Sequence, residues 1–246
     1  MTFLEMDMLH LLVAALVTVS AAAVQGTLGF GFGLLSVSLL RLVDPGLAPV
    51  PQMVVTLFLV VLLARREQEF IVWREVTWVS QGRLLGAAAG ALVLGFASTR
   101  VLDGLVGVMM LGAVSLMGLG RAPSLTPHAL RTAGVAASFS SVVCAVGGPP
   151  LAVVYASVAG PRLRATLACH FFVGMVFALA ARWLSGALPL QQVLLGVALL
   201  PFAFVGYRLS SMLKDHVEGH QLRLGILVLV VLSAGSLLLR SLAGTS

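Results

Sequence analysis

Two interruptions of apolar sequence by helix-breaking residues constrain this chain more than any other feature. The first runs from Gln25 to Gly33 and is rich in glycine, and the second is Gly147-Gly148-Pro149-Pro150. Both lie within sequence apolar enough for a membrane interior. Each unpaired backbone amide or carbonyl that faces lipid there costs several kcal/mol, so irregular backbone persists only inside protein or along a polar cavity. We therefore expect both interruptions in the interior of the protein.

The composition is that of an integral membrane protein. Of 246 residues, 59% are hydrophobic and 10% are charged, whereas soluble domains contain roughly 25% charged residues. A spanning helix needs about 20 residues, so the chain is expected to be an all-α polytopic protein without a separate soluble domain. Its basic residues lie in short loops between apolar blocks, which indicates membrane topology rather than binding to nucleic acid.

The apolar blocks form two series of five, separated by turn and charge clusters such as Asp44-Pro45-Gly46. Each block is expected to be a helix or a half-helix. Blocks 31–43 and 149–160 are too short to span a membrane and are expected to be re-entrant. The first series is 8–25, 31–43, 49–64, 75–97 and 101–119, and the second is 129–146, 149–160, 165–184, 190–207 and 221–240.

The two series predict an internal duplication. A shift of 116 to 118 residues places Gly148 on Gly31, Pro161 on Pro45, Gly206 on Gly90 and Gly225 on Gly107. Glycine and proline positions that recur at a nearly constant offset, with matching block lengths, are typical of repeats. We therefore expect one membrane domain made of two repeats, residues 1–120 and residues 121–246.

The positions of Lys and Arg indicate the orientation of these repeats. If the loop after block 49–64 is cytoplasmic, eleven Lys and Arg, Arg83 among them, lie inside and four lie outside, a bias typical of membrane proteins. The count requires that each half contain a re-entrant or broken hairpin and three spanning helices. An odd number of spans inverts the second half, so two inverted repeats with 8–10 helical segments are expected. A plain eight-helix arrangement stays open.

The interruptions themselves are candidates for an anion site. The alternating glycines of 29–33 allow positive φ and close approach of the backbone, and Pro149 suits the first turn of a helix. Two helix amino termini that meet near the midplane would offer amides and positive dipole ends to an anion. The alternative interpretation is that the glycines only permit close helix packing.

Polar side chains within the apolar blocks are functional candidates. Gln52 and Thr56 share a helix face, and Thr166 and His170 repeat the same spacing. Because histidine changes charge near neutral pH, His170 suggests that transport is coupled to protons. Coupling to another ion is the alternative. The predicted substrate-binding residues are Gln25, Gly29, Gly31, Gly33, Gln52, Gly147, Gly148, Pro149, Thr166 and His170.

Enzyme motifs are missing from the sequence. It contains no Ser-His-Asp constellation, no spacing typical of a metal site and no phosphate-cradling GxxxxGK[ST] pattern. We therefore expect a protein that is not an enzyme, with no catalytic residues, metal or cofactor, whose transport is driven by a gradient.

The glycine run Gly29–Gly33 after an amino-terminal helix, with Gly147-Gly148-Pro149-Pro150 before Tyr155 and Thr166, resembles the sulfite exporter TauE/SafE family. The resemblance covers residues 10–240, including the two halves. It implies a small all-helical permease that moves sulfite, organosulfonates or related small anions across the cytoplasmic membrane, in the direction of export.

Other functions stay open beside this one. A passive anion channel could use the same scaffold, with the glycine loops as its filter. A transporter of a carboxylate or an uncharged solute, and a structural membrane subunit, are further alternatives. The expected partners are a small anion and the lipid bilayer, without nucleic acid, and the oligomeric state is not assigned by the sequence.

Overall fold

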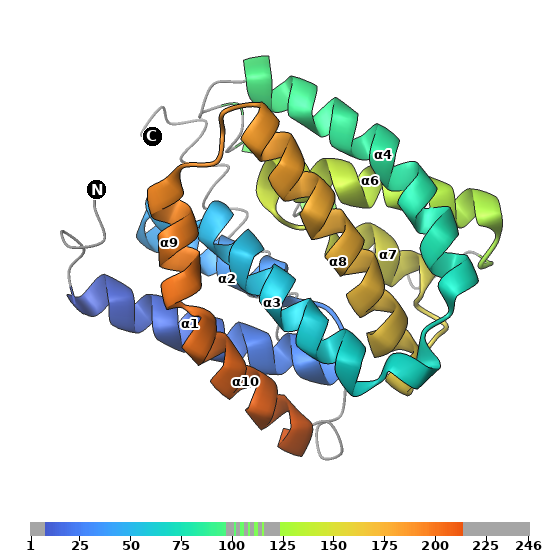
Figure 1. The fold of residues 1–246 in the computed structure, drawn as a ribbon, viewed down its shortest axis with the longest axis horizontal. Helices are drawn as coiled ribbons and strands as arrows, with labels where there is room; N and C mark the ends of the chain where they lie inside the picture. The colour runs from blue at the N-terminus through green and yellow to red at the C-terminus, as the bar shows by residue number, and fades with distance from the viewer. Residues whose placement is uncertain are drawn as a thin grey trace.

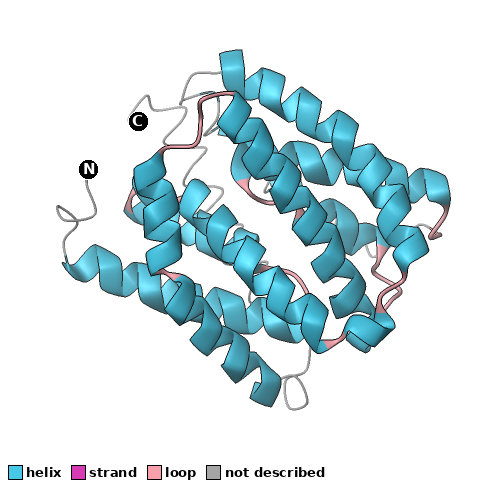
Figure 2. Cartoon of the chain, in the orientation of Figure 1, coloured by secondary structure: helices cyan, strands magenta, loops and turns pink. Residues whose placement is uncertain are grey.

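The computed structural model describes residues 8–96 and 124–213, together with a few positions between 101 and 115. These residues form nine α-helices and two short 3-10 turns, without a strand among them (Figures 1 and 2). The all-helical prediction is confirmed for this part of the chain. The helices are α1 (Met8–Leu28), α2 (Phe32–Val43), α3 (Val50–Arg66), α4 (Trp73–Phe96), α6 (Pro127–Cys144), α7 (Gly148–Val154), α8 (Gly160–Leu184), α9 (Leu190–Ala198) and α10 (Leu200–Leu213), and the turns are η2 (Pro45–Leu47) and η3 (Gln68–Phe70).

Three of the described helices, α1, α4 and α8, are long and apolar enough to cross a membrane. The pair α9 and α10, bent by 42° at its break, gives a fourth candidate span. Block 221–240 and most of block 101–119 lie outside the described residues, as do Gly107 and Gly225. The chain is therefore a multi-pass helical protein.

Two block boundaries differ from the prediction. The short helix after the second interruption ends at Val154, not near residue 160, because the chain turns at Tyr155, Ala156 and Ser157. Block 190–207 is interrupted after Ala198 and continues to Leu213. The first short helix, α2, has the expected length of a half-helix.

Left-handed backbone makes both interruptions possible. Gly29 and Gly31 adopt φ angles of 88° and 113° between α1 and α2, a region that glycine enters without a steric penalty. At the second interruption Ala145 adopts φ 58°. The Ala145 amide donates to the Ser141 carbonyl at 2.9 Å, and the Val146 amide donates to the Ser140 carbonyl at 3.4 Å. These bonds satisfy carbonyls at the end of α6 that have no helical partner.

Glycines bring the helices together at two matching places. Along α4, a Cβ atom at Gly86 would overlap the carbonyl oxygen of Val135 on α6, and Gly82 and Gly90 also face α6. Between α1 and α10, a Cβ atom at Gly206 would overlap the carbonyl oxygen of Val19. Close backbone approach through small residues is the usual packing mode of membrane helices, because lipid gives apolar side chains no reason to associate.

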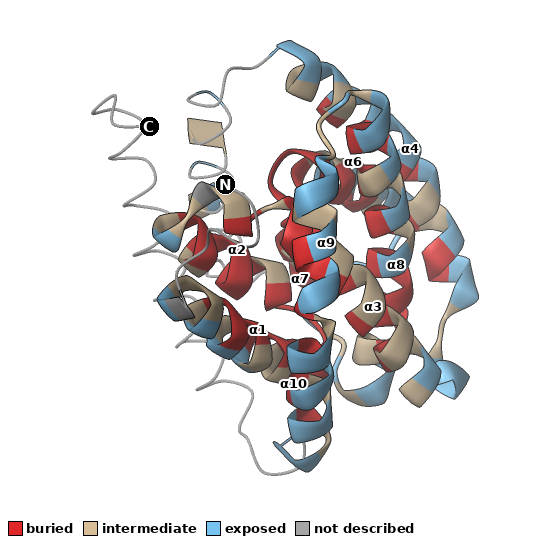
Figure 3. Cartoon of the chain, turned by 60° about the vertical axis from the view of Figure 1, so that its left-hand side comes forward, coloured by how far each residue is buried: buried red, intermediate tan, exposed pale blue. Residues whose placement is uncertain are grey.

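Burial separates an inner group of helices from an outer one. Eight of the twelve α2 residues and four of the seven α7 residues are buried (Figure 3). By contrast α4, α9 and α10 expose large apolar side chains, among them Leu84, Leu85, Leu194 and Phe204. Such exposure would favour aggregation in water, and it suits helices that face lipid. The two interrupted segments thus lie inside a shell of apolar helices.

We expect Gly86→Ala to lower the thermal midpoint of the purified protein, because the added methyl group overlaps the α6 backbone and overpacking costs about 1–3 kcal/mol. Gly95→Ala on the same helix is the control, since no atom lies within 4 Å of its Cβ position. Both variants gain the same helix propensity, so the difference between them isolates packing. Equal midpoints would contradict the close α4–α6 contact.

Candidate functional site

A small cavity of about 20 Å³, the volume open to the centres of water molecules, lies between the two interruptions. The interruptions touch there, because a Cβ atom at Gly33 would lie 2.6 Å from the Ala145 carbonyl oxygen. Two segments more than one hundred residues apart thus enclose one space. Its lining residues are Gln25, Gly31, Gly33, Leu34, Thr56, Ala145, Val146, Gly147, Gly148, Phe171 and Met175.

Gln25 both holds the first interruption in place and offers a donor to the cavity. Its side chain is 3% exposed. The Oε1 atom accepts a hydrogen bond of 3.1 Å from the Phe32 amide at the start of α2. The Nε2 atom has no hydrogen-bond partner. A buried amide without an acceptor is costly, at about 1–3 kcal/mol, and an acceptor bound in the cavity would remove that cost.

The amino terminus of α2 adds backbone donors. Its cap is Gly31, which has no side chain to accept from the first turn. Gly33 and Leu34 lie in that turn, where amides have no helical acceptor, and both residues line the cavity. Together with the Gln25 amide they give this wall donor character without a fixed positive charge.

The second interruption contributes less. Helix α7 has only seven residues, with Pro149 and Pro150 in its first turn, and proline has no amide hydrogen to donate. Gly147 and Gly148 line the cavity and Pro149 does not. The expected pair of equivalent helix amino termini is therefore unequal, with most of the donors on the side of α2.

Five of the predicted binding residues do not line the cavity, namely Gly29, Gln52, Pro149, Thr166 and His170. Gln52 is buried and donates from Nε2 to the Leu47 carbonyl at 3.2 Å. Thr56, one turn after Gln52, does line the cavity, and its hydroxyl donates to the Gln52 carbonyl at 2.7 Å. Thr166 accepts from the Val72 amide at 3.3 Å. Gln52 and Thr166 therefore hold backbone segments in place.

His170 belongs to a chain of hydrogen bonds that starts near the surface. Arg162, whose side chain is 48% exposed, contacts Glu75 Oε1 at 2.7 Å. The Tyr155 hydroxyl donates to Glu75 Oε2 at 2.9 Å, and it lies 2.9 Å from His170 Nε2. Because that hydroxyl donates to the carboxylate, we assign the imidazole proton to Nε2. The Nδ1 atom of His170 has no partner.

Two arginines neutralise the carbonyl ends of the interrupted helices. Arg66 Nη2 donates to the Gly26 carbonyl of α1 at 2.7 Å. Arg182 donates to the Val142 and Val143 carbonyls of α6 at 2.9 and 2.8 Å. The carboxyl end of a helix carries partial negative charge. Arg66 and Arg182 therefore stabilise the two places where a helix stops inside the bundle.

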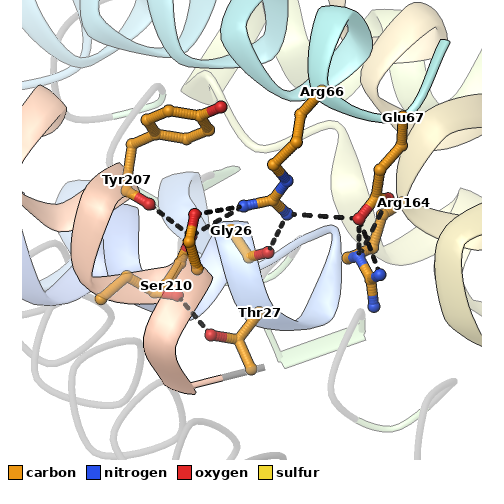
Figure 4. Close-up of polar contacts among 9 residues, drawn as sticks. Gly26, Thr27, Arg66, Glu67, Arg164, Tyr207 and Ser210 are labelled. Carbon is orange, nitrogen blue, oxygen red and sulfur yellow. Dashed lines mark hydrogen bonds and ion pairs between the residues drawn. The ribbon is translucent and has the colours of Figure 1, made fainter. Parts of the chain in front are cut away.

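A cluster of ionic side chains surrounds Arg66 (Figure 4). Arg164 makes a bidentate pair with Glu67, with distances of 2.7 to 3.0 Å, and Arg66 lies 3.6 Å from the same carboxylate. Arg66 also donates to the Ser210 hydroxyl of α10 at 3.1 Å. A Cβ atom at Gly29 would lie 3.0 Å from Arg164 Cα. The cluster thus ties α1, α3, α8 and α10 together beside the first interruption.

Sequence reasoning was wrong about Arg83. Counted above with the cytoplasmic loops, this residue is fully buried within α4, so it contributes nothing to the charge bias of the loops. A charged residue well inside block 75–97 was the signal that could have identified it, since intramembrane charges usually have a function. Glu75 was likewise not singled out, because its partners lie on distant segments.

An all-helical bundle with several candidate spans and a donor-lined cavity between two interrupted helices defines a polytopic membrane transport protein. A comparison with protein families matches residues 14–237 to the family described as sulfite exporter TauE/SafE, and the chain belongs to this family. It is therefore a membrane transporter of sulfite or a similar anion and not an enzyme. Neither the curated proteins nor the solved structures gave a match.

We expect Glu67→Gln to destabilise the protein by on the order of 3 kcal/mol, because it leaves two poorly exposed guanidinium groups without their shared counter-charge. A thermal melt in detergent measures the effect. Glu69→Gln, two residues away and exposed, is the control and should melt as the unmodified protein does. A Glu67→Gln midpoint equal to that of the control would show that the cluster contributes nothing to stability.

Proposed function

We propose that this protein is a secondary transporter that exports sulfite, an organosulfonate or a similar small anion across the cytoplasmic membrane. The anion would bind in the cavity between Gln25, Gly31 and Gly33 on one side and Gly147 and Gly148 on the other. One observation carries the proposal: the buried Gln25 lines this cavity, and its Nε2 donor has no hydrogen-bond partner. The amides of the first α2 turn border the same space.

The character of the lining favours an anion over a cation. No carboxylate is among the residues that line the cavity, and those from α1 and α2 include Gln25, whose Nε2 donor has no partner. Such donors bind an oxyanion without the desolvation cost of a buried fixed charge. A carboxylate anion would suit the same donors, and a passive anion channel would use the same lining. These remain the alternative functions.

Two inverted repeats, residues 1–120 and 121–246, are part of the proposal. Under the shift of 116 residues, α1 corresponds to α6, α3 to α8, and α4 to the bent pair α9 and α10. The packing of α4 against α6 then corresponds to the packing of α10 against α1. Likewise, the packing of α4 against α8 corresponds to that of α9 against α3. Arg66 and Gly26 correspond to Arg182 and Val142, which make the same contact. This agreement in contacts supports the duplication.

Proton coupling is the proposed source of energy. The hydrogen bonds from Glu75 through Tyr155 to His170 connect the partly exposed Arg162 with a buried imidazole and fix its tautomer. Arg83 is the further charged group that acts on His170. A proton taken up at the free Nδ1 of His170 would create charge next to Arg83. Binding an anion nearby would offset that charge, which links the two movements.

We expect Gln25→Glu to weaken sulfite binding about 10- to 100-fold, because a hydrogen bond to a charged ligand is worth about 1.5–3 kcal/mol. The substitution retains an acceptor for the Phe32 amide and replaces the free donor with an oxygen. Because it also buries a carboxyl group, the melting midpoint without ligand is measured beside the affinity. Binding is measured by calorimetry with sulfite, a sulfonate, sulfate, a carboxylate and an uncharged control. Gln25→Ala, which also removes the acceptor, should bind weakly too.

Gln191→Ala is the matched control, since this glutamine is exposed on α9. It should bind sulfite with the affinity of the unmodified protein. A folded Gln25→Glu protein with unchanged affinity would remove the cavity from the proposal.

We expect His170→Gln to abolish the dependence of transport on an imposed pH gradient. The measurement is flux of a sulfonate into proteoliposomes, because a sulfonate keeps its charge over the range in which histidine titrates, about pH 5–8. His128→Gln at the exposed start of α6 is the control. Full pH dependence in the His170→Gln protein would rule out this residue as the coupling group.

A further inference from the structure

Arg83 is a buried cation whose donors are all unused. It is 0% exposed, and its Nε, Nη1 and Nη2 atoms have no hydrogen-bond partner in the structure. An isolated buried charge is among the most expensive features a protein can contain. The two buried carboxylates of the described residues are engaged elsewhere, Glu67 with Arg164 and Glu75 with Arg162.

The other buried arginines do not share this condition. Arg182 donates to two carbonyls of α6, and Arg41 contacts the Ala48 carbonyl at 3.4 Å. Arg66 and Arg164, which are slightly more exposed, bind carbonyl, hydroxyl or carboxylate oxygens. The fold therefore supplies acceptors to guanidinium groups wherever they are structural, and Arg83 is the exception among these residues.

The helices packed against α4 carry two more buried polar atoms without partners. Its guanidinium occupies the space above Gly174 of α8, where a Cβ atom would overlap Nη1. His170, with a free Nδ1, lies one turn before Gly174 on the same face of α8. On α6 the Ser138 hydroxyl has no partner, and it packs beside Gly86, one turn after Arg83. Three helices thus each bring one unsatisfied group to a common interface.

We propose that Arg83, Ser138 and His170 form a second binding site for a small inorganic anion at the interface of α4, α6 and α8. Arg83 supplies the charge and several N–H donors, and the Ser138 hydroxyl supplies another. Protonation of His170 at Nδ1 adds a further donor, so proton and anion binding at this site favour each other. The identity of the anion as the transported species rests on the proposed function, whereas the existence of the site does not.

This site is separate from the cavity, although one helix serves both. Helix α8 presents Phe171 and Met175 to the cavity. The residue preceding each of these, His170 and Gly174, faces Arg83. The two sites therefore lie on neighbouring faces of α8. An anion bound at either site would contact this helix.

The test is a thermal melt of purified protein in detergent with gluconate as the only other anion, titrated with sulfite, sulfate and chloride. The reference is Gln25→Glu, in which the cavity site is disabled. We expect at least one of the three anions still to stabilise this variant. Adding Arg83→Gln should abolish that rise in midpoint. Adding Arg65→Gln, an exposed arginine at the end of α3, should leave it intact.

Two further comparisons guard against misfolding. In gluconate alone, Arg83→Gln should be at least as stable as the unmodified protein, because it removes an unpaired buried charge. Arg83→Lys, which keeps the charge but loses the planar set of donors, should bind the anion about tenfold more weakly than arginine does.

The outcomes separate the two proposals. The Arg83 site is disproved if Gln25→Glu is stabilised by none of the three anions, or if adding Arg83→Gln leaves the stabilisation unchanged. The site is also disproved if the Arg83→Lys protein binds the anion as tightly as the protein with arginine at this position. Sulfite binding that is unaffected by Gln25→Glu but lost in Arg83→Gln would support the Arg83 site and contradict the proposed cavity site.

Discussion

Helix ends that lie inside an apolar bundle are the constraint on which the rest of this structure depends. At both interruptions the backbone has donors and acceptors that neither a helix nor lipid can satisfy. The fold meets this demand with specific partners: Gln25 for the Phe32 amide, Arg66 for the Gly26 carbonyl and Arg182 for the Val142 carbonyl. Gly33 and Leu34 of the first α2 turn, whose amides have no helical acceptor, line the cavity in which we propose that the anion binds.

The same constraint explains the arrangement of the outer helices. Irregular backbone must be enclosed, so α2 and α7 lie inside while α4, α9 and α10 expose their apolar side chains (Figures 1 and 3). Lipid provides no hydrophobic force that would hold these helices against the rest of the bundle. Close packing does so instead, and the glycines of α4 and α10 allow the helix backbones to approach closely. Ionic contacts such as that between Glu67 and Arg164 join the ends of the helices. Enclosure, close packing and paired charges therefore all keep the irregular backbone of the two interruptions inside the protein.

The sequence predicted those features that local chemistry determines. Glycine and proline mark where helices break, and block lengths distinguish half-helices from spans, so the interruptions near Gly31 and Gly148 and the all-helical class could be recognised. The i, i+4 spacing of Thr166 and His170 showed that they share a face, but not which neighbour that face meets. That depends on how each helix rotates about its axis when it packs, which is why neither residue reaches the cavity.

Charged residues were harder to assign, because their environment is set by segments far along the chain. Arg83 was counted as a loop residue, although α8 provides its surroundings through Gly174, 91 residues later. Glu67 pairs with Arg164 across 97 residues, and no spacing rule reveals such a contact. Long-range electrostatic partners thus require the three-dimensional structure, whereas the duplication of helix breaks does not.

Counterflow in proteoliposomes tests the central claim most directly. Vesicles loaded with unlabelled sulfite are diluted into a trace of labelled sulfite, and the internal label is followed with time. A transporter that binds sulfite between the two interruptions should accumulate label transiently above its equilibrium level, and Gln25→Glu should abolish that overshoot. Label that rises only to equilibrium would indicate a channel, and an overshoot unaffected by Gln25→Glu would place the binding site elsewhere.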